Sequence, residues 1–167
     1  MAISASDVKE LRERTGAGML ECKQALEAAK GDVQKAMAAL KEKGHKLAEK
    51  RAGRETAEGM VQSYIHHNHR VGALVEVNSE SDFVARTDDF KDLVKAIALQ
   101  VGGSNPKYLS KEDMPKDSEE DPKLVCLLEQ SYLKDESVTI AELVRDTIAK
   151  TGENIRIKRF ARFELGN

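Results

Sequence analysis

Residues Met60–Val77 read MVQSYIHHNHRVGALVEV, with two apolar runs on either side of a polar stretch. Together the two runs are rich in Val, Ile and Tyr, which are residue types that favour strands. In the second run the apolar residues alternate with others, so that they fall on one face of a strand: Val71, Ala73, Val75 and Val77. The polar stretch His66–His69 is typical of a turn, and the region therefore predicts a β-hairpin.

A second alternating stretch, Ile155–Leu165, lies near the end of the sequence. One face of this predicted strand carries Ile155, Ile157, Ala161, Phe163 and Leu165, and the other carries Arg156, Lys158 and Arg162. Between the hairpin and this strand, Thr87 can cap a helix from Asp88 to about Val101, which Gly102-Gly103 is expected to end. Together these elements predict an α+β fold with a core of three-stranded antiparallel sheet packed with helices.

The first 45 residues predict three short helices. Ser4 or Ser6 can cap the first, because a Ser hydroxyl accepts a hydrogen bond from an unpaired backbone N–H, and Gly16-Ala17-Gly18 interrupts it. A second helix is expected from about Met19 to Ala29, before Gly31. Asp32 can cap the third helix, and Gly44 is expected to end it.

These patterns divide the chain into three parts: a three-helix domain at 1–45, a basic linker at 46–58 and an α+β core at 59–167. The linker owes its charge to Lys46, Lys50, Arg51 and Arg54, and it is expected to be helical. Within the core, the acidic stretch 111–121 is predicted to be an exposed connector. A short helix is expected over Pro122–Tyr132, and another from Thr139 to Thr151, with Gly152 at its C-terminal end.

Composition argues against several classes of protein. The 167 residues include 27 basic and 29 acidic side chains, and a net charge of -2 is unlike that of a general phosphate-backbone binder. Aromatic residues make up 4% and Trp is absent, which leaves few platforms for stacking bases. No apolar run suits an ordinary membrane span, and Met1–Asp7 lacks a secretory-signal pattern. The two cysteines, Cys22 and Cys126, cannot form a disulfide framework, so a reducing cytoplasm is expected.

Motifs for catalysis or metal binding are missing from the sequence. It has no phosphate-binding glycine loop, no Cys-x-x-Cys pair and no His-Glu-x-x-His pattern, so we expect no enzyme, no cofactor and no metal. A metal at His66, His67 and His69 is the alternative, but neighbouring strand residues point to opposite faces, which favours a solvated hairpin tip. Cys22 lies on the apolar face of its helix and is expected to be a small buried side chain.

The stretch Ser81-Asp82-Phe83-Val84-Ala85-Arg86 stands out between the hairpin and the long helix. It is predicted to form a turn that holds one of only seven aromatic residues of the chain. A structural interpretation is that Phe83 and Val84 pack at the start of the helix while Asp82 caps the turn. This interpretation is adequate for any single residue of the stretch.

Four stretches of the chain resemble the bacterial elongation factor Ts family of translation factors, in a short form. They are Val8–Met19 with Glu21–Leu26, Gly53-Arg54 with Ala57–Gly59, Asn78–Arg86, and Gly152–Ile155 with Arg159-Phe160 and Arg162–Glu164. They follow the order of the family and span nearly the whole chain. The most specific are Asp82–Ala85 and the Thr15–Met19 turn. Leu20 stands where many members have Met, a swap that costs little, and Ser131 stands where Pro is common.

This resemblance implies a guanine-nucleotide exchange factor for the GTPase elongation factor Tu. It implies that the stretch Ser81–Arg86, comprising Ser81, Asp82, Phe83, Val84, Ala85 and Arg86, inserts near the magnesium site of the GTPase and displaces the ion and GDP. Phe83 would wedge between GTPase helices, and Asp82 would hydrogen-bond there. Met19, Leu20 and Lys23 match positions that contact the GTPase domain. His66, His67 and Arg70 are a further candidate contact.

The resemblance also implies an assembly. Long members carry two related halves in the core, whereas this chain has room for one, and short members pair as homodimers. A three-stranded sheet with one helix layer would leave apolar residues such as Val71 and Phe163 poorly covered, which a second copy would remedy. We therefore expect a homodimer bound to two GTPase molecules in the bacterial cytoplasm, without membrane or direct nucleic-acid contact.

Two other functions remain open from the sequence. Residues 1–56 contain 12 basic and 9 acidic side chains, which is compatible with an RNA-binding ribosome accessory. The three-helix unit resembles ubiquitin-associated domains, which is compatible with a small protein-binding adaptor. The net charge of -2 and the few aromatic residues count against the first function, and Asp82-Phe83 distinguishes an exchange factor from an adaptor.

Overall fold

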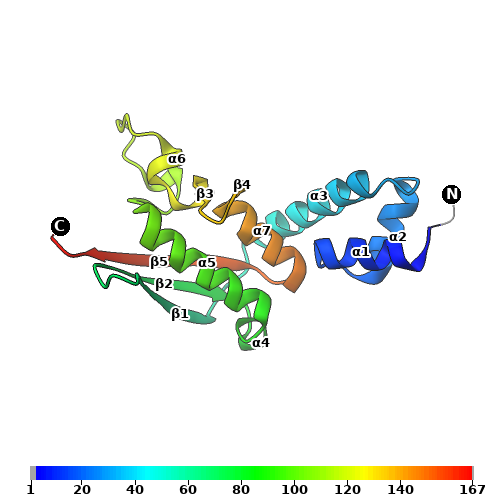
Figure 1. The fold of residues 1–167 in the computed structure, drawn as a ribbon, viewed down its shortest axis with the longest axis horizontal. Coiled ribbons are helices and arrows are strands. Elements are labelled where there is room, and N and C mark those ends of the chain that lie inside the picture. Colours follow the sequence, from blue (N-terminus) through cyan, green and yellow to red (C-terminus); the bar gives the residue numbers. More distant parts are fainter. Residues whose placement is uncertain (1–2, 167) are drawn as a thin grey trace.

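The computed structural model describes residues 3–166 and has the predicted α+β fold (Figure 1). Its helices are α1 (Ala5–Thr15), α2 (Met19–Ala28), α3 (Val33–Arg51), α4 (Asp82–Ala85), α5 (Asp88–Ser104), α6 (Pro122–Val125) and α7 (Ile140–Thr151), with 3-10 turns η1 (Lys111–Asp113) and η2 (Leu127–Glu129). Its strands are β1 (Glu58–Ile65), β2 (Val71–Ser79), β3 (Ser131–Tyr132), β4 (Asp135–Thr139) and β5 (Ile155–Glu164).

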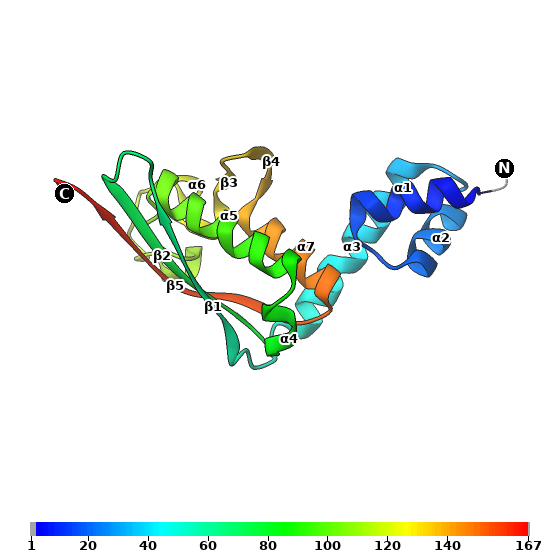
Figure 2. The ribbon, with the colours of Figure 1, turned by 60° about the horizontal axis from the view of Figure 1, so that its bottom comes forward.

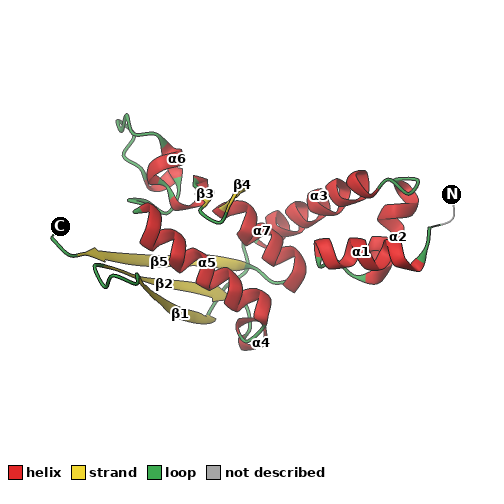
Figure 3. Ribbon diagram, in the orientation of Figure 1, coloured by secondary structure: helices red, strands yellow, loops and turns green. Residues whose placement is uncertain are grey.

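The main sheet contains the predicted hairpin and the late strand. Its order is β1-β2-β5, both pairs are antiparallel, and Tyr64 lies opposite Ala73 in the hairpin. Helix α5 packs across β1 and β2, and the helices lie on one face of the sheet (Figures 2 and 3). The core between them includes Val75, Val77, Phe90 and Ile97, each at most 1% exposed.

Strand β5 differs from the predicted alternation. Val77 pairs with Ile157 but Glu76 pairs with Arg159, so Lys158 is an extra residue in a β-bulge. The bulge shifts the later side chains by one position. Phe160 and Arg162 therefore face the helices, and the Arg162 Nε donates to the Gly102 carbonyl oxygen at 3.1 Å.

The prediction that Ala161, Phe163 and Leu165 share the face of Ile155 and Ile157 is therefore wrong. Ile155 and Ile157 are buried, whereas the three later residues are exposed on the other face. The prediction that Phe163 lacks cover on the monomer agrees with its 73% exposure, but Val71 is half-buried on the helix side.

The N-terminal helices form a second, smaller core. Leu11, Cys22, Leu26 and Ala36 are fully buried there, apart from the main core. The predicted caps are present, because the Ser4 hydroxyl accepts from the Asp7 N–H and the Asp32 carboxylate accepts from the Lys35 N–H. The burial of Cys22 confirms that it is a small core residue.

Helix α3 does not end at Gly44, contrary to the sequence-based expectation. It continues to Arg51 and spans from the small core to the large one, where Ala48 is buried (Figure 1). A Cβ placed on Gly44 would lie 2.7 Å from the Cβ of Ala149, so this glycine permits close packing of α3 against α7. The residues predicted as a linker, 46–58, thus include the end of α3 and the start of β1, and the domain boundaries remain predictions.

Two glycines in α5 also fail to end their helix, which runs to Ser104 and is followed by Asn105 at a φ of 48°. Gly102 lies against the ring of Tyr64, where a Cβ would clash, and Gly103 lies against the end of the Leu133 side chain. The predicted helix over Pro122–Tyr132 is instead α6, η2 and β3 in succession. By contrast, α7 has the predicted Thr139 cap and Gly152 end, and the acidic connector 111–121 is mostly exposed.

Candidate functional site

The stretch Ser81–Arg86 forms a single helical turn, α4, where a turn of polar and apolar residues was predicted. Ser81 caps it by accepting from the Val84 N–H. Val84 and Ala85 are 4% and 7% exposed and anchor the turn in the main core. Phe83 is 76% exposed and points away from that core, so α4 presents an aromatic side chain to solvent.

The charged residues of α4 pair with each other. An Asp82 carboxylate oxygen lies 2.8 Å from an Arg86 guanidinium nitrogen, and both side chains are largely exposed. The interpretation that Phe83 packs at the start of the next helix and that Asp82 caps the turn is therefore wrong. Ser81 provides the cap, Thr87 caps α5, and the Phe83 side chain is exposed.

The position of α4 depends on a loop whose role was not predicted. Between α7 and β5, the Glu153 carboxylate accepts from the Ser81 N–H at 3.0 Å and from the Ser81 hydroxyl at 2.7 Å. The neighbouring Asn154 N–H donates to the Glu80 carboxylate at 2.6 Å. The sequence signal was present, because Gly152–Ile155 is one of the stretches that carry the family resemblance, but it does not show what these residues contact.

Glu80 joins this loop to the segment that follows α3. The hydrogen bond from the Asn154 backbone, opposed by desolvation and aided by the Arg54 guanidinium, lowers the pKa of the Glu80 carboxyl. The Asn154 side-chain amide in turn donates to the Arg54 carbonyl oxygen at 2.8 Å. The end of the α3 segment, the β2–α4 turn and the α7–β5 loop thus meet at one place.

The second predicted surface lies at the start of α2. Met19 is 48% exposed, Leu20 is 67% exposed and the Lys23 side chain is 60% exposed. Cys22, between them, is buried and holds this turn of helix on the small core. The surface therefore projects from the N-terminal unit, separate from α4.

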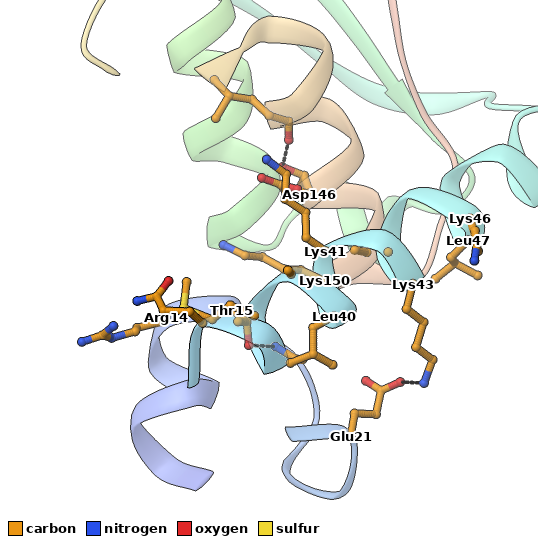
Figure 4. A pocket seen from close by; sticks show the side chains of 18 of the residues that line it. Arg14, Thr15, Glu21, Leu40, Lys41, Lys43, Lys46, Leu47, Asp146 and Lys150 are labelled. Carbon is orange, nitrogen blue, oxygen red and sulfur yellow. Dashed lines mark hydrogen bonds and ion pairs between the residues drawn. The ribbon is translucent and has the colours of Figure 1, made fainter. Parts of the chain in front are cut away.

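A groove of about 770 Å³ runs between the N-terminal unit and α7, along the side of α3 (Figure 4). Several basic residues line the groove, and three of them pair with acidic residues. Lys43 pairs with Glu21 at 2.6 Å, Lys41 with Glu142 at 2.9 Å and Lys150 with Asp89 at 3.5 Å. These pairs reduce the free positive charge of the groove.

The third candidate contact, at the hairpin tip, is far from α4. The turn lies at one end of the hairpin and α4 follows its other end (Figure 2). His66 accepts from or donates to the Tyr64 hydroxyl through Nδ1 at 2.8 Å, while His67 and Arg70 are exposed. Residues 3–166 contain no cluster of three or more His, Cys, Asp or Glu side chains that could hold a metal ion.

The outer face of the sheet carries several exposed apolar side chains beside the Arg159–Glu76 ion pair. Five large side chains on or beside it are 48–73% exposed: Val61, Ile65, Leu74, Phe163 and Leu165. Helices cover the opposite face (Figure 3). Several exposed apolar side chains on one face are typical of protein–protein interfaces.

The described residues also contain no helix long and apolar enough to cross a membrane. The fold and its surfaces define a class of protein: an α+β core joined to a small helical unit, with apolar side chains presented to solvent at fixed positions. Such surfaces are typical of proteins that bind other proteins.

Comparison with known proteins identifies the family within this class. A family model described as Elongation factor TS matches residues 5–124. The elongation factor Ts of Desulfosudis oleivorans is 47% identical over 194 aligned residues, which cover 98% of each chain. Those of Caldanaerobacter subterraneus and Fervidobacterium nodosum are 47% and 44% identical, covering 98% and 99% of this chain and 97% and 100% of theirs.

The chain belongs to the elongation factor Ts family, whose members act in translation elongation. The alignment with the Desulfosudis oleivorans protein is longer than the 167 residues of this chain, so that relative has residues without a counterpart here.

Proposed function

We propose that the protein is a guanine-nucleotide exchange factor for the translational GTPase elongation factor Tu in the bacterial cytoplasm. It performs no covalent chemistry of its own. The observation that carries the proposal is the 76% exposure of Phe83 on a capped helical turn, in a chain of the elongation factor Ts family. An exposed aromatic side chain on a fixed support is suited to fill a partner pocket.

The physical requirement for exchange is differential binding. A GTPase holds GDP through backbone N–H groups around the phosphates and through a magnesium ion. A factor that binds the empty GTPase more tightly than the filled one weakens nucleotide binding by the same factor, because the two equilibria are linked. The factor therefore needs a rigid protrusion rather than a catalytic group.

In this proposal α4 is the protrusion. Phe83 inserts beside the magnesium site of the GTPase, and Asp82 exchanges its pairing with Arg86 for hydrogen bonds to the partner. Val84 and Ala85, which are buried, and Ser81, which caps the turn, support the insertion from below. Loss of the ion and GDP leaves a nucleotide-free complex.

The surface at the start of α2 provides the second contact. Leu20 and Met19 are exposed apolar residues, and Lys23 adds a charge on the same helix. Because these residues lie on the N-terminal unit and not beside α4, the protein can contact the GTPase at two points. The hairpin-tip residues His66, His67 and Arg70 are a candidate for a third contact, with another domain of the partner.

We further propose that two copies pair through the outer face of the sheet and bind two GTPase molecules. The exposed side chains of this face, Phe163 and Leu74 among them, support that assignment. Burying apolar surface contributes about 25 cal/mol per Å² removed from water. The copies would form two sheets packed face to face, with the helices outside.

The test of exchange is the release of a fluorescent GDP analogue from elongation factor Tu. The wild-type protein should accelerate release, and Phe83→Ala should lose most of that acceleration, because truncating a central aromatic contact typically costs about 2 kcal/mol or more. Leu124→Ala is the matched control, since Leu124 is 69% exposed on α6, and it should behave as wild type. No acceleration by wild type would contradict the proposed function.

The test of pairing is the mass of the protein in solution, measured by sedimentation equilibrium. Phe163→Asp should convert a dimer to a monomer, because it buries an unpaired charge in the proposed interface. Leu124→Asp should leave the dimer intact. A wild-type monomer at micromolar concentration would contradict the pairing.

A further inference from the structure

The β2–α4 turn is held by hydrogen bonds to the loop between α7 and β5. The Ser81 hydroxyl donates to the Glu153 carboxylate at 2.7 Å and accepts from the Val84 N–H at 3.3 Å. The Ser81 N–H donates to the other Glu153 oxygen at 3.0 Å. Glu153 therefore orients the hydroxyl that caps α4, although it lies 72 residues further along the chain.

The support of Glu153 is itself fixed. It follows Gly152, which ends α7 with a φ of 73°, and precedes Asn154, which is 2% exposed. The Asn154 backbone N–H is bonded to Glu80 and its side-chain amide to the Arg54 carbonyl oxygen. The end of α7 and the contacts of Asn154 thus fix the loop on either side of Glu153, so that the Glu153 carboxylate can hold Ser81 at a defined place.

Helix α4 needs such support because it is one turn long, with four residues. A single helical turn has no stability of its own, since the first turn fixes several dihedral angles for one hydrogen bond. Its second half is anchored by the burial of Val84 and Ala85. Its first half, which carries Phe83, is held by the Ser81 cap.

We propose that Glu153 is a positioning residue that preorganises the Asp82-Phe83 turn for docking on the partner. It does so by locking Ser81 through two hydrogen bonds, so that the turn is already ordered before it meets the GTPase. Ordering a segment before binding removes the entropic cost of ordering it during binding. The role in docking rests on the proposed exchange function, whereas the locking of the turn is a property of the free protein.

The first measurement is hydrogen exchange of the Val84 amide in the free protein. In Glu153→Ala the protection of this amide should fall about tenfold or more, because the hydroxyl that accepts from it is no longer oriented. Glu153→Gln keeps an acceptor oxygen and should retain part of the protection. Glu42→Ala removes a carboxylate from an exposed pair with Lys46 and should leave Val84 protected as in wild type. Unchanged protection in Glu153→Ala would overturn the proposal whatever the protein binds.

The second measurement is GDP release from the GTPase at increasing concentrations of the protein. Glu153→Ala should need about tenfold more protein for half-maximal acceleration than wild type, and Glu153→Gln should lie between them. If Glu153 acts through Phe83, the double variant Glu153→Ala/Phe83→Ala should be no weaker than Phe83→Ala alone. A loss that adds to that of Phe83→Ala would mean a general structural role and would overturn the positioning role.

These outcomes separate the two proposals. An inactive wild type would remove the exchange function, and the Val84 protection would still decide whether Glu153 holds the turn. An active wild type with an equally active Glu153→Ala variant would leave the exchange function standing and overturn the role of Glu153. Should Glu153→Ala not fold, the comparison of Glu153→Gln with wild type carries both measurements.

Discussion

The two proposed contact surfaces, at α4 and at the start of α2, are built in different ways. The α2 surface is held by neighbours in sequence, since Leu20 projects beside Cys22, and the small core beneath it comes from α1, α2 and the first half of α3. The α4 surface is held by Glu153, 72 residues away from Ser81. One surface is therefore a product of local helix packing and the other of tertiary structure.

Two packed helices connect the parts of the structure that support the two surfaces. Helix α3 belongs to both cores and packs against α7, the helix that leads into the loop of Glu153 (Figure 1). The α3–α7 contact is therefore the joint between the two surfaces. Its main features are the close approach at Gly44 and the Lys41–Glu142 ion pair.

The largest effect should come from removing both surfaces together. Phe83→Ala and Leu20→Ala should each weaken binding to nucleotide-free elongation factor Tu by about thirtyfold, or about 2 kcal/mol. Because the residues lie on separate units, the losses should add, to about a thousandfold in the double variant. Titration calorimetry of the three variants against wild type measures this. A double variant no weaker than Phe83→Ala would show that the α2 surface makes no independent contact.

A smaller effect is expected from Gly44→Leu, which should push α3 away from α7 where the two helices meet. The added side chain meets the Ala149 Cβ, and overpacking of this kind costs about 1–3 kcal/mol. The variant should melt at a lower temperature and bind the GTPase less tightly, because the two surfaces no longer keep their spacing.

Gly53→Leu is the matched control for that variant. Gly53 lies just beyond α3 and has open space around its Cβ position, so substitution there should change the stability by less than about 0.5 kcal/mol. Equal melting temperatures for the two variants would contradict the role of Gly44 in the joint.

The smallest effect, and one that depends on pH, is expected from Glu142→Gln. The Thr139 backbone N–H and the Lys41 ammonium lower the pKa of the Glu142 carboxyl from 4.5 to about 2. Because the folded pKa is the lower one, the ionised carboxylate stabilises the fold above about pH 4.5, and this contribution is lost as the pH falls toward 2. The variant keeps an acceptor for the Thr139 cap but loses the charge.

Denaturant titrations at several pH values test this prediction. Wild type should exceed Glu142→Gln in free energy of unfolding by about 1 kcal/mol near neutral pH, and the difference should vanish near pH 2. Glu136→Gln, which removes the same charge from exposed β4, should match wild type throughout. A difference that does not change with pH would mean that the charge of Glu142 is not what stabilises the joint.

The features that the sequence predicts correctly have local causes, and those that it does not predict have causes far away in the chain. Caps at Ser4, Asp32, Thr87 and Thr139 were predicted correctly because a cap depends on residues three positions away. Glycines were misinterpreted where they lie inside helices. Gly44, Gly102 and Gly103 allow close approach to Ala149, Tyr64 and Leu133, none of which is a neighbour in sequence.

The candidate site shows the division most clearly. The family resemblance pointed to Asp82 and Phe83, and the structure places Phe83 in solvent, but whether they and the α2 surface contact the partner stays a prediction. Glu153 and Asn154, which hold the turn of Asp82 and Phe83, belong to a stretch that carries the family resemblance, but the sequence assigns them no role.

The sequence by itself determined the α+β class, the hairpin, the helix starts and the family, because alternation, helical spacing and caps act over a few residues. Tertiary structure alone decided three features: the continuation of α3 beyond Gly44, the bulge at Lys158 that turns Phe163 outward, and the hydrogen bonds between Ser81 and Glu153. Each of these depends on a contact between segments far apart in the chain, whose distance and geometry no local pattern specifies.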